Sequence, residues 1–514
     1  MPNNAFKYAF IVAFGGFIFG LDAALISGTV DFVSSEFGLT DLQKGLVVSS
    51  PGWGVLLALL AAGYVVDKLG RKRTLQIIAI LYLVSALCST FAPSYWALVS
   101  ARFIGGLAFT SLSLAAMYIG EIAPSHLRGQ LVAMNQINIV VGLSAAYFIN
   151  YLILQTSKLD AAWVADWGIS THTWRWMLGS EIMPALLWSL LLLFIPRSPR
   201  WLVLKDKLAE AKTVLAKLMP QEQIETEIVQ IQESLAQENL KLSFSEQIKK
   251  LFDTRLKKAI IIGLTFAIVQ QTTGINAILF YAPTVFSQLG LGTDAAFVQA
   301  VWVGVCSVIA TVLALLLIDK IGRRPMTIWG LLWAVVSLGI CAYGFHQATY
   351  TLTPEDVASI ENLNPNQLQS MIGIEYASDV DFKAALKEKL GAASSLFEGT
   401  LIQKAGTLPG TMILFGIMSF IAAFQFSVGP IMWIIFSEIF PTRVRGIAIP
   451  ACALVTSLVS VLIQQFFPWQ LTNMGARDIF LFYALTSAVG LVALFQLLPE
   501  TKNKTIEEIE AELQ

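Results

Sequence analysis

The sequence has few charged residues, and this shortage limits the kind of protein it can encode. Asp, Glu, Lys and Arg make up 13% of the 514 residues, whereas soluble domains carry about 25%. Apolar residues make up 56% of the chain. A soluble fold of this size could not cover so much apolar surface, because the outside of a folded chain must stay wet. The net charge of −1 gives no reason to expect a nucleic-acid partner.

Cysteine and histidine are also scarce. The four cysteines all fall inside apolar runs, so we expect neither a disulfide nor a metal site; they are Cys88, Cys306, Cys341 and Cys452. The three histidines lie near helix ends or in loops, and no nucleophile–base pair is apparent. The sequence therefore predicts no enzyme and no cofactor.

What the chain does contain is a series of long apolar runs. A helix that crosses a bilayer needs about 20 mostly apolar residues. The first run, from Tyr8 to Val30, is too long for a signal peptide and contains Asp22, so it is read as a membrane span. The runs predict twelve transmembrane helices, at 8–29, 45–66, 74–92, 95–121, 130–153, 175–195, 257–282, 296–318, 325–346, 408–437, 446–468 and 475–498.

Basic residues gather in alternate loops between these runs. Because Lys and Arg accumulate on the cytoplasmic side of a membrane, these loops predict that both termini are cytoplasmic. The loops concerned hold Lys68, Arg71, Lys72 and Arg73, then Arg128, then Lys320, Arg323 and Arg324, then Arg443 and Arg445.

Two polar segments interrupt the apolar runs. Residues 197–256 carry apolar residues at helical spacing, which predicts short amphipathic helices in the cytoplasm; the spaced residues are Ile224, Ile228, Ile231 and Leu235. Residues 347–405 form an insert on the outer face. Helix-start signals occur there at Thr353 and Ser378, but no motif indicates what the insert does.

The chain also repeats itself. The segment 67–71 (DKLGR) recurs at 319–323 (DKIGR), and 121–129 recurs in outline at 438–446. These repeats predict an all-α membrane protein with two pseudo-symmetric bundles of six helices, as in transporters that alternate between two states. The expected divisions are 1–196 for the first bundle, 197–256 for linker helices, 257–498 for the second bundle with its insert at 347–405, and 499–514 for a cytoplasmic tail.

Several motifs occur in one order along nearly the whole chain. They are Gly63-x-x-x-Asp67-x-x-Gly70-Arg71-x-Arg73, Pro196-Arg197-Ser198-Pro199-Arg200-Trp201-Leu202, Gln270-Gln271-x-x-Gly274-x-Asn276, Gly429-Pro430-x-x-Trp433 and Pro499-Glu500-Thr501-Lys502. In this order the chain resembles the sugar porter family of the major facilitator superfamily, and its bacterial proton-coupled symporters in particular. The resemblance implies the major facilitator fold and transport of a sugar.

Three charged residues lie inside predicted spans: Asp22, Arg102 and Glu181. Each stands about six or seven residues, or roughly 10 Å, from the outer end of its helix. A lone charge in the membrane costs roughly 2.5–3.5 kcal/mol, so we expect the three to meet. Two acids and one guanidinium leave room for one proton, which makes a proton switch the leading hypothesis. The alternative is a static ion pair, but the resemblance favours the switch, because proton-coupled members have Asp at this first position.

The seventh predicted helix carries Gln270, Gln271 and Asn276. Amides donate and accept hydrogen bonds, as sugar hydroxyls do; the alternative is that they join packed helices. In the family this motif binds the sugar, and Gln136 is assigned to the same site by resemblance. Two aromatic residues are further candidates to face the sugar ring, with ordinary packing as the alternative: Trp433, which follows a helix-weakening Pro430, and Phe19.

The repeated motifs supply charged residues at the inner membrane boundary. We expect salt bridges there, within and between the halves, that favour the outward-open state. The predicted gating residues are Asp67, Arg71, Glu121 and Arg128 in the first half, and Asp319, Arg323, Glu438 and Arg445 in the second.

Together these features predict a secondary active transporter that moves a monosaccharide or polyol with protons. The alternatives are an uncoupled uniporter or exporter and, less favoured, a sugar sensor, which would need an output module beyond the last helix. The expected partners are the small-molecule substrate, the proton as coupling ion and the lipid bilayer. By analogy with its relatives, the chain is expected to be a monomer in a bacterial inner membrane.

Overall fold

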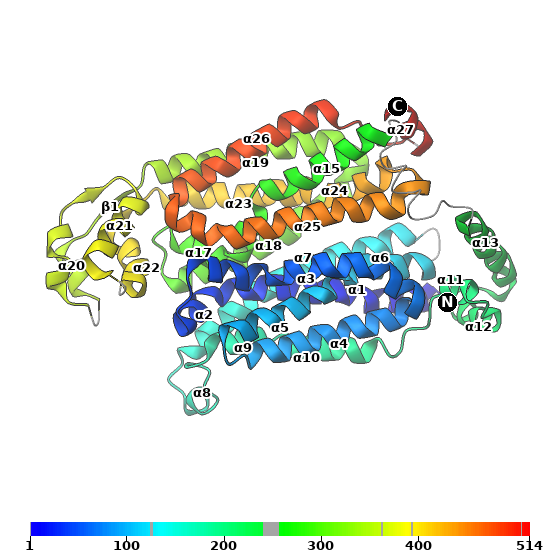
Figure 1. Cartoon of the computed structure of the whole chain (residues 1–514), viewed down its shortest axis with the longest axis horizontal. Helices are drawn as coiled ribbons and strands as arrows, with labels where there is room; N and C mark the ends of the chain where they lie inside the picture. Colours follow the sequence, from blue (N-terminus) through cyan, green and yellow to red (C-terminus); the bar gives the residue numbers. More distant parts are fainter. Residues whose placement is uncertain are drawn as a thin grey trace.

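The computed structural model describes residues 2–123, 127–239, 256–360, 363–391, 394–504 and 506–513. It is an elongated bundle of helices that run side by side along the long axis (Figure 1). The helices of the first half are α1 (Pro2–Leu25), η1 (Ile26–Gly28), α2 (Val30–Phe37), α3 (Asp41–Leu69), α4 (Arg71–Thr90), α5 (Tyr95–Leu107), η2 (Ala108–Thr110), α6 (Ser111–Ile122), α7 (Arg128–Ser157), α8 (Ala162–Asp166), α9 (Thr173–Gly179) and α10 (Ile182–Leu191).

The second half follows after three linker helices, α11 (Pro199–Leu204), α12 (Leu208–Leu218) and α13 (Gln221–Asn239). Its helices are α15 (Lys257–Thr272), α16 (Ile275–Phe280), α17 (Ala282–Ser287), α18 (Thr293–Ile321), α19 (Arg323–His346), α23 (Gly410–Phe426), α24 (Val428–Ile439), α25 (Thr442–Asn473) and α26 (Gly475–Leu497). A short helix, α27 (Ile506–Leu513), ends the described chain and buries Ile509 against the second half.

Within the described residues, eleven helical segments are long and apolar enough to cross a membrane. They correspond to eleven of the twelve predicted spans. The sixth predicted span, 175–195, is present as two shorter helices, α9 and α10, separated at Ser180 and Glu181. Pro184 accounts for the break, because proline has no N–H to donate to the Ser180 carbonyl one turn earlier.

Other spans are also broken, and the breaks follow from particular residues. The seventh span changes direction at Gly274, whose φ of 81° is one that a side chain would disfavour. The tenth span breaks at Ser427, between α23 and α24. Pro430 follows three residues later and cannot donate to the Phe426 carbonyl, so the predicted weakening of this helix is confirmed.

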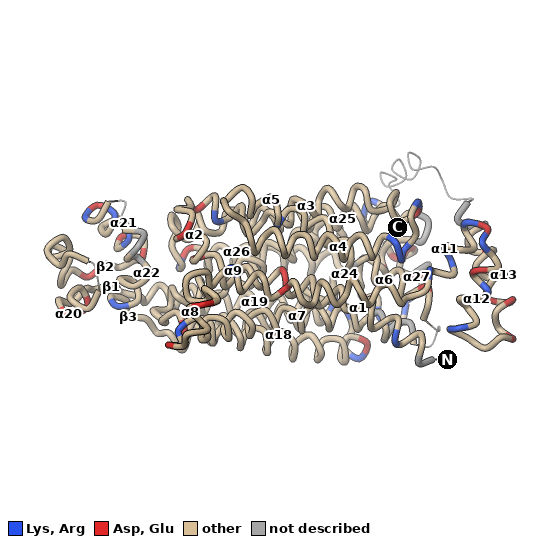
Figure 2. Tube along the Cα trace, turned by 90° about the horizontal axis from the view of Figure 1, so that it is seen from below, with Lys and Arg blue, Asp and Glu red and all other residues tan. Residues whose placement is uncertain are grey.

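Two opposite ends of the bundle can be distinguished. Residues 347–407 extend beyond one end, which we call the insert end, whereas α11–α13 and both chain termini lie at the other, the terminal end (Figure 1). Lys, Arg, Asp and Glu gather mainly at the two ends of the helical body and are sparse between them (Figure 2). The body between the ends is therefore the part suited to a bilayer.

Polar contacts join the two halves near the insert end. Tyr147 Oη donates to the Leu279 carbonyl over 2.6 Å, and Trp53 Nε1 donates to Gln465 Oε1 over 3.0 Å. At the rim, Lys158 Nζ lies 2.5 Å from Asp294 Oδ1. All of these belong to the insert-side portions of their helices, so the halves are closed against each other at that end.

The linker helices are as the sequence predicts. In α13 the four residues at helical spacing form its buried side; they are Ile224, Ile228, Ile231 and Leu235. This side packs on α11 and α12, so the three helices form one small unit at the terminal end.

The insert has a core of its own, built on Tyr350 and Phe382, whose rings stack 5.8 Å apart. Both predicted helix starts in it are confirmed: Thr353 caps the first helix and Ser378 Oγ accepts from the Asp381 amide. The sequence did not indicate its strands, which are too short to show alternation. The elements are β1 (Thr349–Thr351), α20 (Pro354–Ala358), η4 (Pro365–Gln367), η5 (Gln369–Met371), β2 (Glu375–Tyr376), α21 (Asp379–Leu390), α22 (Ser394–Ala405) and β3 (Gly406–Thr407), with antiparallel sheet order β2-β1-β3.

A buried lysine of the insert forms an ion pair within its own helix and also donates to two groups of the second half. Lys383 Nζ lies 2.9 Å from Asp379 Oδ2, and both side chains are only 8% exposed. The same ammonium donates to Gln288 Oε1 beyond α17 and to the Leu471 carbonyl of α25. The insert therefore sits on helices of the second half at the insert end.

Candidate functional site

Three charged side chains meet inside the first half. Arg102 of α5 places Nη1 3.2 Å from Asp22 Oδ1 of α1, and its Nε donates to the Val47 carbonyl over 3.1 Å. Glu181, at the break between α9 and α10, lies close enough for its carboxyl to interact with that of Asp22. All three side chains are almost fully buried. The predicted juxtaposition of Asp22, Arg102 and Glu181 is therefore present in the structure.

The hydrogen bonding of this ion cluster is incomplete. Asp22 Oδ2 and Glu181 Oε1 are buried and find no hydrogen-bond partner among the described residues. A buried carboxylate oxygen without a partner is costly. Two carboxyls facing a single guanidinium carry one negative charge too many, and one proton removes it. The geometry is thus suited to holding one exchangeable proton.

The amides of the seventh span form a second site, in the other half. Gln270 Nε2 donates to the Gly429 carbonyl over 3.4 Å, and Gln271 Nε2 donates to Gln270 Oε1 over 2.9 Å. Asn276 Nδ2 then donates to Gln271 Oε1 over 2.8 Å and to Ser460 Oγ over 2.7 Å. The three predicted amides are therefore brought together in one row, which continues onto α25.

The position of Asn276 depends on the break in its helix. Gly274 adopts a left-handed conformation between α15 and α16, and a Cβ built there would lie 2.5 Å from the ring of Tyr483. Any larger residue would both strain the backbone and push Tyr483 away. This break turns Asn276 towards Ser460 while Gln270 and Gln271 remain in the first part of the span.

The remaining predicted substrate residues lie outside this row. Gln136 is half-buried on α7 of the first half. Trp433 on α24 is 45% exposed, with its ring edge-on to Phe436. Phe19 is half-buried on α1 and packs edge-on against Phe109 at 4.5 Å. Trp433 therefore keeps an exposed part of its indole, whereas Phe19 is more enclosed.

The predicted gating charges of the first half form a compact cluster at the terminal end. Arg71 Nε and Nη2 each lie 3.0 Å from Glu121 Oε1, and both side chains are 9% exposed. Ser198 Oγ donates to the other oxygen of the same carboxylate. Asp67 is 3.9 Å from Arg71 and largely exposed, so it contributes less.

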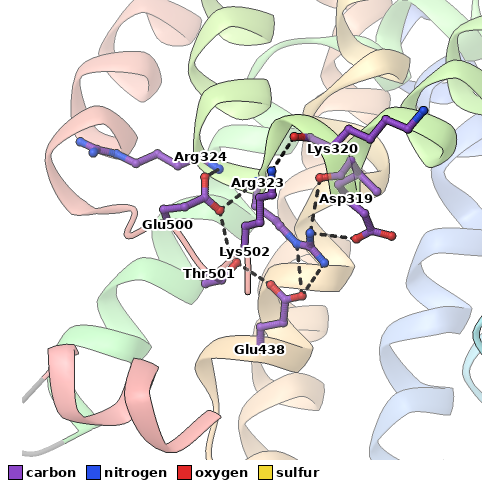
Figure 3. Close-up of polar contacts among 9 residues, drawn as sticks. Asp319, Lys320, Arg323, Arg324, Glu438, Glu500, Thr501 and Lys502 are labelled. Carbon is purple, nitrogen blue, oxygen red and sulfur yellow. Dashed lines mark hydrogen bonds and ion pairs between the residues drawn. The ribbon is translucent and has the colours of Figure 1, made fainter. Parts of the chain in front are cut away.

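The second half repeats this cluster (Figure 3). Arg323 Nη2 lies 2.9 Å from Glu438 Oε1 and Nη1 lies 2.9 Å from Asp319 Oδ1. Thr501 Oγ1 donates to Glu438 Oε2 over 2.6 Å, as Ser198 does to Glu121. In both clusters the partners come from one half, so these bridges hold the helices of each bundle together.

Glu500 ties the chain end to this cluster. Its carboxylate accepts from the backbone amides of Arg323 and Arg324 over 3.1 and 3.2 Å (Figure 3). It lies against Gly322, whose φ is 108° and where a Cβ would come within 2.6 Å of Glu500 Oε2. The glycine is required by this contact as well as by the turn.

Two predicted gating residues, Arg445 and Arg128, are not among the described charged residues that form these two clusters. Arg445 directs Nε and Nη2 to the Phe440 carbonyl, each over 3.1 Å, which stabilises the end of α24. The side chain of Arg128 lies outside the described part of the structure.

Sequence reasoning missed four members of these sites. Ser460 and Gln464 extend the amide row, and Ser198 and Thr501 complete the carboxylate clusters. Ser460 and Gln464 are polar residues one turn apart in an apolar span, and that spacing could have been noticed. The equivalence of Ser198 and Thr501 could have been found by extending the repeat to the two Pro-x-hydroxyl segments at 196–198 and 499–501.

Two repeated helical halves, an uncharged polar row in one and a buried ion cluster in the other, define a membrane transporter built to alternate between two states. Comparison with known proteins agrees with this class. The profile of the family described as "Sugar (and other) transporter" matches residues 8–360 and 391–513. The chain belongs to this family, and it is an integral membrane transporter rather than an enzyme.

Individual relatives match over nearly the full chain. An arabinose-proton symporter of Bacillus subtilis (strain 168) is 32% identical over 497 residues, which cover 96% of this chain and 92% of the symporter. The inward-open conformation of the xylose transporter XylE from E. coli superimposes with a TM-score of 0.75 at 27% identity, covering 99% of this chain and 100% of that one. The proton:xylose symporter XylE bound to 6-bromo-6-deoxy-D-glucose gives a TM-score of 0.71 at 28% identity, covering 100% and 99%.

Proposed function

We propose that the chain is a symporter that carries a monosaccharide together with a proton by alternating access. The observation that carries this proposal is the buried cluster of Asp22, Arg102 and Glu181, in which Asp22 pairs with the guanidinium and a second buried carboxyl, that of Glu181, lies beside Asp22. Relatives named as arabinose-proton and proton:xylose symporters support the same reading.

The proton acts on the contact between α1 and α5. With both acids ionised, Arg102 holds Asp22 and the cluster carries a net negative charge. Protonation of one carboxyl neutralises the cluster, and protonation of Asp22 itself weakens its ion pair with Arg102. The helices are then free to shift relative to each other, so proton binding is linked to the change between the two states.

The sugar binds to the amide row and adjoining residues. Gln270, Gln271 and Asn276 offer donors and acceptors that match neutral hydroxyl groups, and Trp433 offers a ring face for the apolar side of a pyranose or furanose. Gln136 on α7 of the first half is assigned to the same site by its resemblance to the family. No charged side chain belongs to the described row, which suits an uncharged substrate.

The distribution of basic residues between the two ends of the bundle supports one orientation in the membrane. The terminal end holds the basic loops that begin at Lys68 and Lys320, so by the positive-inside rule it faces the cytoplasm with both chain termini. The insert then faces outwards. The closed insert end corresponds to an inward-facing state, in agreement with the inward-open relative. We place the protein in a bacterial inner membrane as a monomer.

Uptake into proteoliposomes tests the proposal. Labelled D-xylose, L-arabinose, D-glucose and D-galactose are offered with and without an inward proton gradient. One proton crossing 100 mV supplies about 2.3 kcal/mol, enough for roughly 40-fold accumulation of a neutral solute. We expect accumulation by the wild type that depends on the gradient.

The variant Asp22→Asn separates coupling from transport. It removes the titratable group but keeps the shape, so we expect sugar exchange to continue while accumulation is lost. The exposed Asp67→Asn is the matched control and should accumulate sugar as the wild type does. Accumulation by Asp22→Asn would exclude the proton role of Asp22, and uptake that never responds to the gradient would favour an uncoupled uniporter.

A further inference from the structure

The amide row does not end at Asn276 but continues into α25. Ser460 Oγ accepts from Asn276 Nδ2 over 2.7 Å and from Gln464 Nε2 over 2.7 Å. Gln464 lies one turn further along α25 and is held in place by Tyr281 Oη, which donates to its carbonyl over 2.9 Å. The Ser460 side chain is half-buried, so it remains accessible from one side.

The directions of the hydrogen bonds from Gln270 to Ser460 follow from the first member of the row, and Gln464 Nε2 also donates to Ser460 Oγ. The Gly429 carbonyl is a pure acceptor, so Gln270 must present its NH₂ group to it and its oxygen to Gln271. Gln271 must then donate to Gln270, which leaves its own oxygen to accept from Asn276. Asn276 therefore faces both Gln271 and Ser460 with its NH₂ group, and Ser460 receives a hydrogen bond.

A count of the groups left over shows what the row presents to a ligand. Both hydrogens of Asn276 Nδ2 are used, and its Oδ1, an acceptor, has no hydrogen-bond partner among the described residues. The Ser460 oxygen accepts twice, and within the same described residues its own hydrogen is not donated to any group. An acceptor and a donor thus stand side by side on two hydrogen-bonded residues.

We propose that Ser460 is a specificity-determining residue that donates a hydrogen bond to one sugar hydroxyl, while Asn276 Oδ1 accepts a hydrogen bond from the same group. A sugar hydroxyl can form both hydrogen bonds, because it accepts from Ser460 and donates to Asn276 at a single oxygen. A deoxy position forms neither hydrogen bond and leaves both protein groups unpaired. Gln464 is a positioning residue, because its donation to Ser460 directs the hydroxyl hydrogen towards the ligand. The proposal rests on the sugar-transport function proposed above.

The test is a comparison of substrates across three variants in proteoliposomes. Initial uptake rates are measured for whichever of D-xylose, L-arabinose, D-glucose and D-galactose the wild type carries best, and for the monodeoxy derivatives of that sugar. Ser460→Ala removes the hydroxyl, and Ser460→Thr keeps it. Ser457→Ala, one turn away on the same helix and also half-buried, is the matched control.

We expect Ser460→Ala to raise the KM for the parent sugar by about 2- to 12-fold, the range for loss of one hydrogen bond between neutral groups. We also expect one deoxy derivative that the wild type binds more weakly than the parent sugar. In Ser460→Ala this disadvantage should be smaller, because the deoxy sugar then forgoes only the hydrogen bond to Asn276 Oδ1. Ser460→Thr should restore the wild-type preference, and Ser457→Ala should retain it. Thermal unfolding of each variant shows whether a loss comes from misfolding instead.

The outcomes separate this proposal from the one on which it rests. If the wild type carries a sugar and the KM ratio of every deoxy derivative to its parent is the same in Ser460→Ala as in the wild type, the role of Ser460 is wrong while transport stands. The same holds if Ser460→Thr, although folded, behaves as Ser460→Ala does. If the wild type takes up no sugar at all, both proposals fail together.

Discussion

The two halves of the molecule share a scaffold but not a chemistry. Each half carries an arginine–glutamate pair at the terminal end, completed by a hydroxyl: Arg71–Glu121 with Ser198, and Arg323–Glu438 with Thr501. Between the ends they differ. The first half buries an ion cluster in its spans, whereas the second half buries an uncharged row of amides and hydroxyls.

Under the proposed function this difference corresponds to separate tasks for the halves. What is repeated holds helices together, and what is not repeated would handle the transported species, with the proton in the first half and the sugar in the second. A coupled transporter needs both species to act on one change of state. Coupling then has to pass across the contact between the halves, which in this structure is made near the insert end by residues such as Tyr147 and Gln465.

The largest expected effect is that of Arg102→Met. Loss of this guanidinium leaves Asp22 and Glu181 buried without a counter-charge, and breaking a buried ion pair from one side costs about 3–5 kcal/mol. We expect low yield of folded protein and a strongly reduced Tm, measured by thermal unfolding in detergent.

A neutral version of the cluster should recover most of that loss. The triple variant Asp22→Asn, Arg102→Met, Glu181→Gln contains no buried charge, so its Tm should return towards the wild-type value while sugar accumulation stays absent. An Arg102→Met variant as stable as the wild type would contradict the view that this cluster is a buried charged unit.

The second prediction compares the two repeated clusters. Glu121 and Arg71 are both 9% exposed, whereas Glu438 is 24% exposed, so the first cluster is better shielded from water. Hydrogen bonds to a buried charge are worth about 1.5–3 kcal/mol, and exposed ion pairs about 0–1 kcal/mol. We expect Glu121→Gln to lower the Tm more than Glu438→Gln.

The exposed Asp67→Asn serves as the control and should change the Tm little, because its carboxylate is 73% exposed and 3.9 Å from Arg71. If Glu438→Gln proves the more damaging of the two changes, then Glu500 and the chain end matter more to the second cluster than shielding does to the first.

Much of this architecture could be predicted from the sequence, because long apolar runs and a repeated motif are strong signals. The spans, the amphipathic side of α13, the meeting of Asp22 with Arg102, and the grouping of Gln270, Gln271 and Asn276 all follow from spacing, the cost of buried charge or the family motifs. These signals are local in the sequence, or are repeated, or come from charged residues whose burial without a partner costs much free energy.

The missed features lack such signals. Ser460 joins the amide row from a helix 184 residues further along the chain, and a lone serine in an apolar span costs little if unpaired. The strands of the insert have two or three residues each, too few to show alternation. The break at Glu181 is set by Pro184, which the apolar run concealed although its missing N–H could have been noted.

The smallest predicted effect concerns Glu36 of α2, at the insert end of the first half. Its carboxylate accepts from Trp174 Nε1 over 2.6 Å and from Arg175 Nη2 over 2.7 Å. Burial acts to raise the pKa of Glu36, but these hydrogen bonds outweigh it and the pKa lies below its ordinary value of 4.5.

A group whose pKa is lowered by folding stabilises the folded state above its unfolded pKa, and this stabilisation is lost as the pH falls through the folded pKa. The Tm of the wild type should therefore exceed that of Glu36→Gln at pH 7 by a small margin, since partly exposed pairs are worth about 0–1 kcal/mol. The margin should shrink as the pH falls below about 4.5. The exposed Glu355→Gln is the control and should show no such trend, and a Tm difference for Glu36→Gln that is constant down to low pH would mean that shape, not charge, holds Trp174 and Arg175 in place.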